Sequence, residues 1–302
     1  MKKDILTLSG LESSDFRQLF DRATELKTRH KTGIADRTLV GKSVGLIFDK
    51  PSTRTRISFE VAAIQLGATP IFISSGDTQM ARNEPIEDTA RVMSRYLDGI
   101  AFRTFSQKRL EEFAASCDIP VINALTDTFH PCQILSDLLT IIEHKGDCRD
   151  LNVAWIGDGN NMAHSWINAA AVLGFTLTLA CPKGYAPDPV ILEKARKKNT
   201  AISVTTDPMD AARSADVINT DVWASMGQEN EQQERVKVFE AYQVNSLIMN
   251  VARKDAIVMH CLPAHRGEEI TADVLEGPRS VVWDQAENKM HMHKAILDIL
   301  LT

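Results

Sequence analysis

A five-residue turn early in the chain carries the groups that bind a phosphate. It comprises Ser52, Thr53, Arg54, Thr55 and Arg56. An apolar run at 43–49, broken by Pro51, precedes it and predicts a buried strand. Apolar residues at helical spacing follow it: Ile57, Val61 and Ile64. We therefore expect a helix whose free amides and positive dipole end face the same small volume as the hydroxyls and guanidinium groups. The alternative is an ordinary Ser/Thr helix cap whose arginines point into solvent.

Two further polar groups follow strands in the same half of the chain. Arg103 closes an apolar run at 99–103, and ligands of open α/β sheets collect outside the carboxyl ends of the strands. His130 and Gln133 lie at the start of a helix expected at 131–144. An imidazole and a carboxamide beside free amides can bind an anion or a carbonyl group. The alternative is a capping turn in which a backbone carbonyl satisfies His130.

A glycine-rich turn at 157–162 invites a dinucleotide-binding interpretation. That interpretation is disfavoured, because the third small residue of the fingerprint falls on Met162. In addition, no convincing acidic residue closes the next strand, expected at 176–180. A turn that lets the backbone and Asn161 approach a different ligand fits these residues better.

Two more strand ends carry groups suited to an amino-acid substrate. In the loop at 221–227, Asp221 can pair with an ammonium group and Ser225 can add hydrogen bonds, whereas in the alternative the loop merely packs. Cys261 follows another expected strand, so its thiol should lie at a carboxyl end. His260 is poorly placed as its base, because adjacent residues of a strand point to opposite faces.

The expected elements alternate between strand and helix, which indicates mostly parallel sheets covered by helices. After an amphipathic helix at 12–29, strands are expected at 43–49, 69–73, 99–103 and 121–124. The helix at 131–144 could link two domains, and a second series of strands follows at 152–156, 176–180, 203–205, 217–219, 256–259 and 280–283. We also expect a solvated loop at 228–235 and a short apolar helix at 291–302 that docks elsewhere on the molecule.

The composition favours small-molecule chemistry. The 302 residues, 44% hydrophobic and 25% charged, suffice for two domains. A net charge of −6 argues against a nucleic-acid partner. The five cysteines form no C-x-x-C pair, which favours a protein of the reducing cytoplasm. The sequence has no apolar stretch of the kind expected for a signal peptide or a membrane helix. Four histidines lack a recognisable metal-ligand spacing: His260, His265, His291 and His293.

In order and over essentially the full length, these motifs resemble the ornithine carbamoyltransferase family. The match rests on Ser52–Arg56, Gln79, Arg103, His130–Gln133, Asp221 with Ser225-Met226-Gly227, and His260-Cys261-Leu262-Pro263. The first and fourth motifs are shared with aspartate carbamoyltransferases, whereas the last two indicate ornithine. The resemblance implies two Rossmann-like α/β domains, with the last helix returning to the first. The carbamoyl phosphate-binding domain would span 1–135 plus 286–302, and the ornithine-binding domain 136–285.

The resemblance also assigns residue roles in a homotrimer with sites at subunit interfaces. Carbamoyl phosphate would be bound by Ser52, Thr53, Arg54, Thr55, Gln79 of a neighbouring subunit, Arg103, His130, Pro131, Cys132, Gln133, Cys261, Leu262 and Lys289. Ornithine would be bound by Asn161, Asp221, Ser225 and Met226. Arg103, His130 and Cys261 would be the catalytic residues. Lys289 departs from the Arg that many relatives carry after Ala-Glu-Asn, and an ammonium group lacks the bidentate geometry of a guanidinium.

The implied activity is transfer of the carbamoyl group from carbamoyl phosphate to the δ-amine of L-ornithine, giving L-citrulline and phosphate in cytoplasmic arginine biosynthesis. No metal or organic cofactor is expected, since the mixed anhydride is already activated. Alternatives are a carbamoyltransferase for putrescine, an acylated ornithine or aspartate, a nucleotide-dependent oxidoreductase, and a non-catalytic binding protein. Putrescine would leave Asp221 with little to pair with, because it lacks the α-amino acid head.

Overall fold

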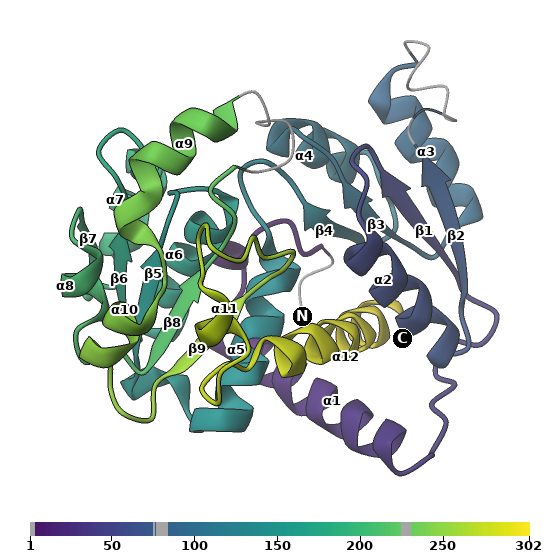
Figure 1. Cartoon of the computed structure of the whole chain (residues 1–302). Helices are drawn as coiled ribbons and strands as arrows, with labels where there is room; N and C mark the ends of the chain where they lie inside the picture. Colours follow the sequence, from purple (N-terminus) through teal and green to yellow (C-terminus); the bar gives the residue numbers. More distant parts are fainter. Residues whose placement is uncertain (1–3, 75, 77–83, 225–230) are drawn as a thin grey trace. The chain divides into compact units, whose positions relative to one another are not determined.

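The computed structural model describes residues 4–74, 76, 84–224 and 231–302, and it divides the chain into two compact units (Figure 1). The first unit consists of Met1–Leu139 with Asn288–Thr302, and the second is Thr140–Glu287. The expected α/β architecture is confirmed, because each unit contains a parallel sheet flanked by helices. Which substrate each unit binds stays a prediction at this point.

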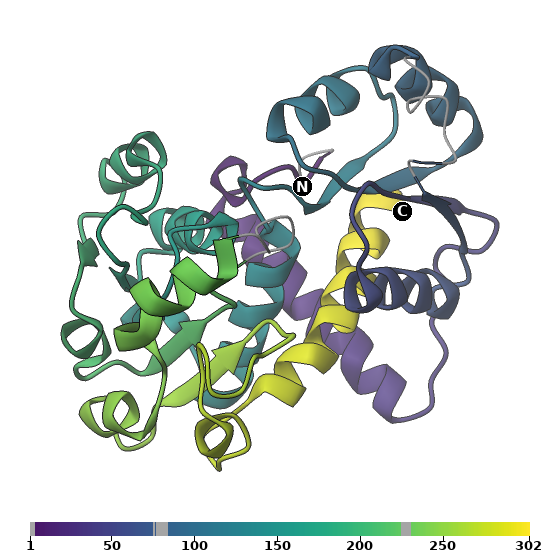
Figure 2. The same ribbon diagram turned by 45° about the horizontal axis from the view of Figure 1, so that its top comes forward.

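A four-stranded parallel sheet forms the centre of the first unit, with the strand order β2-β1-β3-β4. Its strands are β1 (Ser43–Phe48), β2 (Thr69–Ser74), β3 (Gly99–Arg103) and β4 (Val121–Leu125). Its helices are α1 (Ser13–Lys31), α2 (Thr53–Gln65), α3 (Ile86–Tyr96), α4 (Gln107–Ala115) and the first part of α5 (Pro131–Lys145). In Figures 1 and 2, α3 and α4 lie on one side of this sheet and α2 lies on the other.

A five-stranded parallel sheet forms the centre of the second unit, with the order β7-β6-β5-β8-β9. Its strands are β5 (Asn152–Ile156), β6 (Thr176–Ala180), β7 (Ile202–Thr205), β8 (Val217–Thr220) and β9 (Ile257–His260). Its helices are α6 (Asn161–Leu173), α7 (Pro189–Arg196), α8 (Pro208–Ala212), α9 (Gln232–Phe239), α10 (Ser246–Val251) and α11 (Ala272–Leu275). Its buried apolar cluster includes Trp223, Phe239 and Tyr242.

The C-terminal helix α12 (Val282–Leu301) returns to the first unit, as expected. Polar contacts hold it to α1, beside which it lies in Figures 1 and 2: Lys27 donates a buried hydrogen bond to Asn288 at 2.7 Å, and Arg22 pairs with Asp298 at 2.7 Å. Thr38 also donates to Asp298. Late residues of the chain therefore become part of the first unit's interior.

Two expectations for the second half of the chain are wrong. Residues 280–283 form no strand: Ser280 makes an isolated bridge with Val258, and α12 already begins at Val282. The β-branched run is only two residues long, and Asp284 in the first helical turn favours a helix N-terminus. The expected loop at 228–235 is also incorrect for its described part, since Gln232 begins α9 and Arg235 is buried in an ion pair.

The helix α2 is confirmed, but its buried face is not the one that the apolar spacing indicated. Ile57 and Ile64 are 51% and 61% exposed. The buried side chains of α2 are Thr55, Ser58, Phe59, Ala62 and Ala63. The small and polar residues of this helix therefore pack inward. None of the helices within the described ranges combines the length and apolar character that a membrane span requires.

We expect Gly159→Ala to destabilise the second unit. The Gly159 amide donates to the Tyr185 carbonyl at 2.8 Å, and an added Cβ would lie 2.3 Å from the Pro187 nitrogen and 2.5 Å from the Ala186 carbonyl carbon. Overpacking against backbone costs about 1–3 kcal/mol or more. Urea unfolding should show this loss for Gly159→Ala. Gly76→Ala is the control, because its Cβ would meet nothing closer than 3.7 Å; equal stability of the two variants would contradict the prediction.

Candidate active site

The turn at 52–56 forms the N-terminus of α2, as the sequence predicted. Ser52 is the cap, and its Oγ accepts the Thr55 amide at 3.3 Å. Thr53 and Arg54 are exposed, whereas Thr55 is buried. The first helical turn therefore presents hydroxyls, a guanidinium group and the positive end of the helix dipole, a combination suited to a phosphate. The capping interpretation is also correct, because one serine provides the cap while its neighbours face outward.

His293 on α12 supports this turn from inside the first unit. The Ser58 hydroxyl donates to the Thr55 carbonyl at 3.0 Å, so the His293 Nδ1, 2.9 Å from the Ser58 Oγ, carries the proton and donates to it. The imidazole also stacks on Phe59 with ring centroids 3.6 Å apart and an interplanar angle of 10°. From the sequence, the only role weighed for His293 was that of a metal ligand, which its spacing did not support. Its i, i+4 spacing from Lys289 was the available signal for a shared helix face.

Arg103, His130, Gln133 and Lys289 are all buried side chains of the first unit. Lys289 on α12 donates to the Gln133 Oε1 at 2.8 Å, and Gln133 in turn donates to Asp137 at 2.8 Å. Burial lowers the pKa of His130 well below its ordinary value, and the positive charges of Lys289 and Arg103 lower it further. A neutral imidazole thus lies within the electrostatic reach of two cations.

Cys132 does not contribute its side chain to this group. Pro131 begins α5 and Cys132 is its second residue. The thiol is fully buried and donates to the Asn123 carbonyl at 3.3 Å. Burial raises the pKa of the Cys132 thiol to about 12, so it stays protonated and unreactive. Any contact of Cys132 with a ligand would have to come from its backbone.

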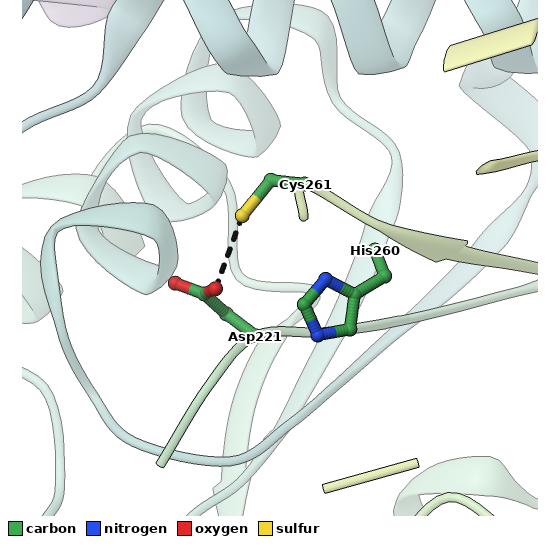
Figure 3. A group of neighbouring side chains, drawn as sticks. All are labelled: Asp221, His260 and Cys261. Carbon is green, nitrogen blue, oxygen red and sulfur yellow. Dashed lines mark hydrogen bonds between the residues drawn. The ribbon is translucent and has the colours of Figure 1, made fainter. Parts of the chain in front are cut away.

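The second unit brings Asp221 and Cys261 together at the ends of neighbouring strands (Figure 3). Asp221 follows β8 and Cys261 follows β9, and the thiol donates to the Asp221 Oδ1 at 3.1 Å. Asn160 caps α6 and donates to the other oxygen of Asp221 at 3.4 Å. Asn161 is the first residue of α6. A carboxylate, a thiol and a helix N-terminus therefore occur at one edge of this sheet.

His260 forms its hydrogen bonds with other residues, but the opposite faces expected from the strand alternation are not observed, because one of its ring nitrogens, the Cys261 Sγ and an Asp221 oxygen all lie within 4.8 Å of one another. Its Nδ1 accepts the Leu262 amide at 2.8 Å, so its Nε2 carries the proton and donates to the Glu269 Oε1 at 2.9 Å. Both side chains are buried. Leu262 adopts a left-handed backbone conformation with φ +58°. The buried dyad thus holds the backbone that follows Cys261 in a conformation that costs energy for a leucine.

Among the described residues, two groups of side chains have atoms close enough to share a metal ion: Asp221 with His260 and Cys261, and His265 with Glu268 and Glu269. In the first group, both ring nitrogens of His260 already form hydrogen bonds, so ligation would break one of them. In the second, His265 Nδ1 lies 3.7 Å from Glu269 and 3.9 Å from Glu268, which are ion-pair distances. The four histidines considered in the sequence do not form one ligand set: His293 pairs with Ser58, while His260 pairs with Glu269.

Three predicted site residues lie outside the described part of the chain. They are Gln79, Ser225 and Met226. Sequence reasoning also missed Arg235, whose guanidinium lies 2.8 Å from the Asp158 carboxylate in the turn between β5 and α6. The polar, acidic run at 228–235 indicated a solvated loop, and no local signal distinguished Arg235 from an exposed residue.

Two of the buried histidines, His130 and His293, predict a specific pH dependence of stability. Burial, followed by Lys289, lowers the pKa of His293 well below its ordinary value of 6.5, and the pKa of His130 is lowered too. Below pH 6.5 the unfolded chain therefore binds protons that the folded protein does not, so the free energy of unfolding decreases as the pH falls. His293→Gln removes one such proton, and between pH 6.5 and 5.5 it should lose about 1 kcal/mol less stability than the wild type.

Urea unfolding at several pH values measures this difference. Ser58→Ala is the control, since it removes the hydrogen bond of His293 but keeps the titrating imidazole. It should be less stable than the wild type at pH 7.5 yet keep the acid dependence. Parallel pH profiles for the wild type and His293→Gln would show that His293 is not the titrating group.

Comparisons with known proteins identify the family of the chain. Residues 3–143 match the carbamoyl-P binding domain of aspartate/ornithine carbamoyltransferases, and residues 149–300 match the Asp/Orn binding domain. The chain is 59% identical over 302 residues to ornithine carbamoyltransferase of Syntrophus aciditrophicus and 56% identical to that of Geobacter sulfurreducens, with all of each chain covered.

The structure of ornithine carbamoyltransferase from Pyrococcus furiosus superimposes with a TM-score of 0.96 at 45% identity, covering 99% of this chain and 96% of that one. The anabolic ornithine carbamoyltransferase from Campylobacter jejuni gives 0.93 at 40% identity, covering 99% of both. With both domains matched and full-length relatives at these identities, the chain belongs to the aspartate/ornithine carbamoyltransferase family.

Proposed function

We propose that this enzyme transfers the carbamoyl group of carbamoyl phosphate to the δ-amine of L-ornithine, forming L-citrulline and phosphate. One observation carries the choice of acceptor: the Asp221 carboxylate and the Cys261 thiol lie 3.1 Å apart at adjacent strand ends of the unit that matches the Asp/Orn binding domain. A carboxylate pairs with the α-ammonium group of an amino acid, which leaves the other end of the substrate for the thiol. The names of the full-length relatives support ornithine over aspartate.

The first unit has the groups that activate the carbamoyl donor. Ser52, Thr53, Arg54 and Thr55 at the start of α2 bind the phosphate, together with Arg103. His130, neutral because of burial and the nearby cations, donates a hydrogen bond to the carbamoyl oxygen without bringing a further charge. Positive charge near the leaving phosphate and donors aimed at the carbonyl oxygen both lower the barrier for breaking the bond between the carbamoyl carbon and the phosphate oxygen.

The second unit orients the attacking amine. The δ-amine has an ordinary pKa near that of lysine, about 10.4, and attacks only after it loses a proton. Asp221 and Asn161 bind the α-amino acid end, and the side-chain amine then lies toward Cys261. The amine nitrogen forms the new bond to the carbamoyl carbon, phosphate departs with the electron pair of the broken bond, and the nitrogen releases its remaining excess proton. Alignment of the two substrates can supply roughly 7–11 kcal/mol of the barrier.

Lys289 positions Gln133 and also keeps a positive charge near the carbamoyl group. It donates to Gln133, which the family resemblance assigns to the carbamoyl amide. The single ammonium group can hold the Gln133 oxygen, and the Gln133 amide group is held by Asp137. By the same family resemblance, the backbone carbonyls of Cys261 and Leu262 would accept hydrogen bonds from the carbamoyl amide of the substrate. The substitution of Lys for Arg therefore keeps a positive charge near the carbonyl but gives up the bidentate fork.

The cellular role and assembly are parts of the same proposal. We infer a homotrimer in which Gln79 of a neighbouring subunit completes the phosphate site, and a cytoplasmic enzyme of arginine biosynthesis. The family resemblance supports the trimer, and the anabolic relative from Campylobacter jejuni supports the biosynthetic direction. Light scattering should give a mass near three times the 33.5 kDa of the chain.

The substrate panel tests the proposal directly. We expect citrulline formation from L-ornithine, with far lower rates for putrescine, N-acetylornithine and aspartate. Putrescine and N-acetylornithine lack the α-ammonium group that pairs with Asp221, and aspartate lacks the side-chain amine that would lie toward Cys261. Binding of NAD serves as a control for the oxidoreductase alternative and should not be detected. Faster turnover of putrescine or aspartate than of ornithine would reject the assignment.

Variants of the two units should fail in different ways. Arg54→Gly and Arg103→Gly each remove charge-assisted hydrogen bonds worth roughly 1.5–3 kcal/mol, so both the affinity for carbamoyl phosphate and the rate should decrease. Cys261→Ser should instead weaken the use of ornithine much more than the binding of carbamoyl phosphate. Steady-state kinetics with each substrate varied measures both effects. Unchanged carbamoyl phosphate affinity in both arginine variants, or equal losses for both substrates in Cys261→Ser, would overturn the assignment of the two halves.

A further inference from the structure

Arg235 is a buried cation of the second unit that contacts the segments next to Asp221 and Asn161. Arg235 belongs to α9, the green helix of Figure 1, and its side chain is only 7% exposed. Its Nη1 donates to the Asp158 Oδ2 at 2.8 Å and to the Trp223 carbonyl at 2.9 Å, and its Nε donates to the Glu231 Oε2 at 3.0 Å. The guanidinium also lies over the Tyr185 ring, 4.9 Å from its centroid. One side chain thus ties together three separate segments.

Two of these segments carry the groups proposed to bind the α-amino acid end of ornithine. Asp158 precedes Asn160 and Asn161 by two and three residues, and Trp223 follows Asp221 by two. The Trp155 indole donates to the Asp158 carbonyl at 2.9 Å, which fixes the backbone of this turn from the other side. Arg235 therefore sets the separation between the Asn161 segment and the Asp221 segment.

The chemistry of the contact favours a positioning role over a purely stabilising one. Burial raises the pKa of Asp158, and the hydrogen bond and charge of Arg235 act against that rise. Buried ion pairs contribute little net stability, because desolvation of both charges offsets their attraction. What such a pair supplies here is geometry, since the rigid fork of a guanidinium fixes several acceptors at once.

We propose that Arg235 is a positioning residue that sets the spacing of the Asp221 and Asn161 segments and thereby the selectivity for an α-amino acid acceptor. This inference rests on the proposed function. It assigns Arg235 no contact with either substrate. Its loss should therefore impair recognition of the α-amino acid head more than binding of carbamoyl phosphate, because the phosphate-binding residues Ser52–Thr55 and Arg103 lie in the other unit.

The network contains its own matched control. Glu231 is 57% exposed and takes only the Nε arm of the fork, whereas Asp158 and the Trp223 carbonyl take the buried Nη1 arm. Arg235→Lys keeps the positive charge but loses the fork. Glu231→Gln weakens the exposed arm and keeps the buried contacts, so it should behave like the wild type.

Kinetics with ornithine, carbamoyl phosphate and 2-aminopentanoate test the inference. The last compound has the α-amino acid head of ornithine and no side-chain amine, so its inhibition constant against ornithine reports head recognition without chemistry. In Arg235→Lys we expect the KM for ornithine and this inhibition constant to rise together by about tenfold, equivalent to about 1.4 kcal/mol. The KM for carbamoyl phosphate should change by less than about threefold, and the ratio of kcat/KM for ornithine over putrescine should fall.

A second variant covers the case in which Arg235→Lys does not fold. The double variant Asp158→Asn with Arg235→Gln removes both charges together, so that neither is left buried and unpaired. It should fold, bind carbamoyl phosphate and show the same loss for 2-aminopentanoate. A wild-type inhibition constant in a folded variant, or equal losses for both substrates, would overturn the positioning role. Failure of the proposed function would appear differently, as wild-type enzyme that forms no citrulline from ornithine.

Discussion

Within each unit, the parallel pairing of strands is the constraint on which the candidate site depends. Parallel neighbours place all their carboxyl ends at the same edge of a sheet, and each crossover starts a helix near that edge. The residues at or just after the ends of β1, β3 and β4 in the first unit, and of β5, β8 and β9 in the second, are therefore brought together by the topology. Ser52, Arg103, His130, Asp221 and Cys261 all occupy such positions, although they are far apart in sequence.

The candidate binding groups of the two units carry opposite charges. The first concentrates positive charge, from Arg103 and Lys289, around a histidine that burial keeps neutral. The second uses a carboxylate, Asp221, whose oxygens accept hydrogen bonds from a thiol and a carboxamide. The first arrangement is suited to a dianion that must leave with negative charge, and the second to the positively charged α-ammonium group of an amino acid. A carbamoyl transfer needs both, and neither needs a redox partner to supply electrons.

Supporting residues account for much of the geometry around these groups. His293 reaches the phosphate turn through Ser58, and the His260–Glu269 dyad holds the Leu262 backbone. Arg235 contacts Asp158, close to Asn161, and the Trp223 carbonyl, close to Asp221. Neither His293 nor Arg235 is identified by a local motif, since each acts on a residue distant in the chain. The C-terminal helix illustrates this, because it carries both Lys289 and His293 into a unit whose other residues end at Leu139.

Most strands and helices, and the polar residue at each strand end, could be predicted from the sequence, because they follow from local patterns: apolar runs, prolines, glycines and helix caps. Three features depend on tertiary contacts instead: which face of α2 is buried, where α12 begins in place of the strand expected at 280–283, and that Arg235 forms a buried ion pair. Ile57 and Ile64 have the spacing of a core face, yet Ser58 and Phe59 face inward, because His293 supplies a partner and a stacking surface there. A charged residue such as Arg235 is solvated by default, and a carboxylate brought to it from 77 positions away reverses that default. Burial of polar groups depends on such distant partners, which local sequence does not reveal.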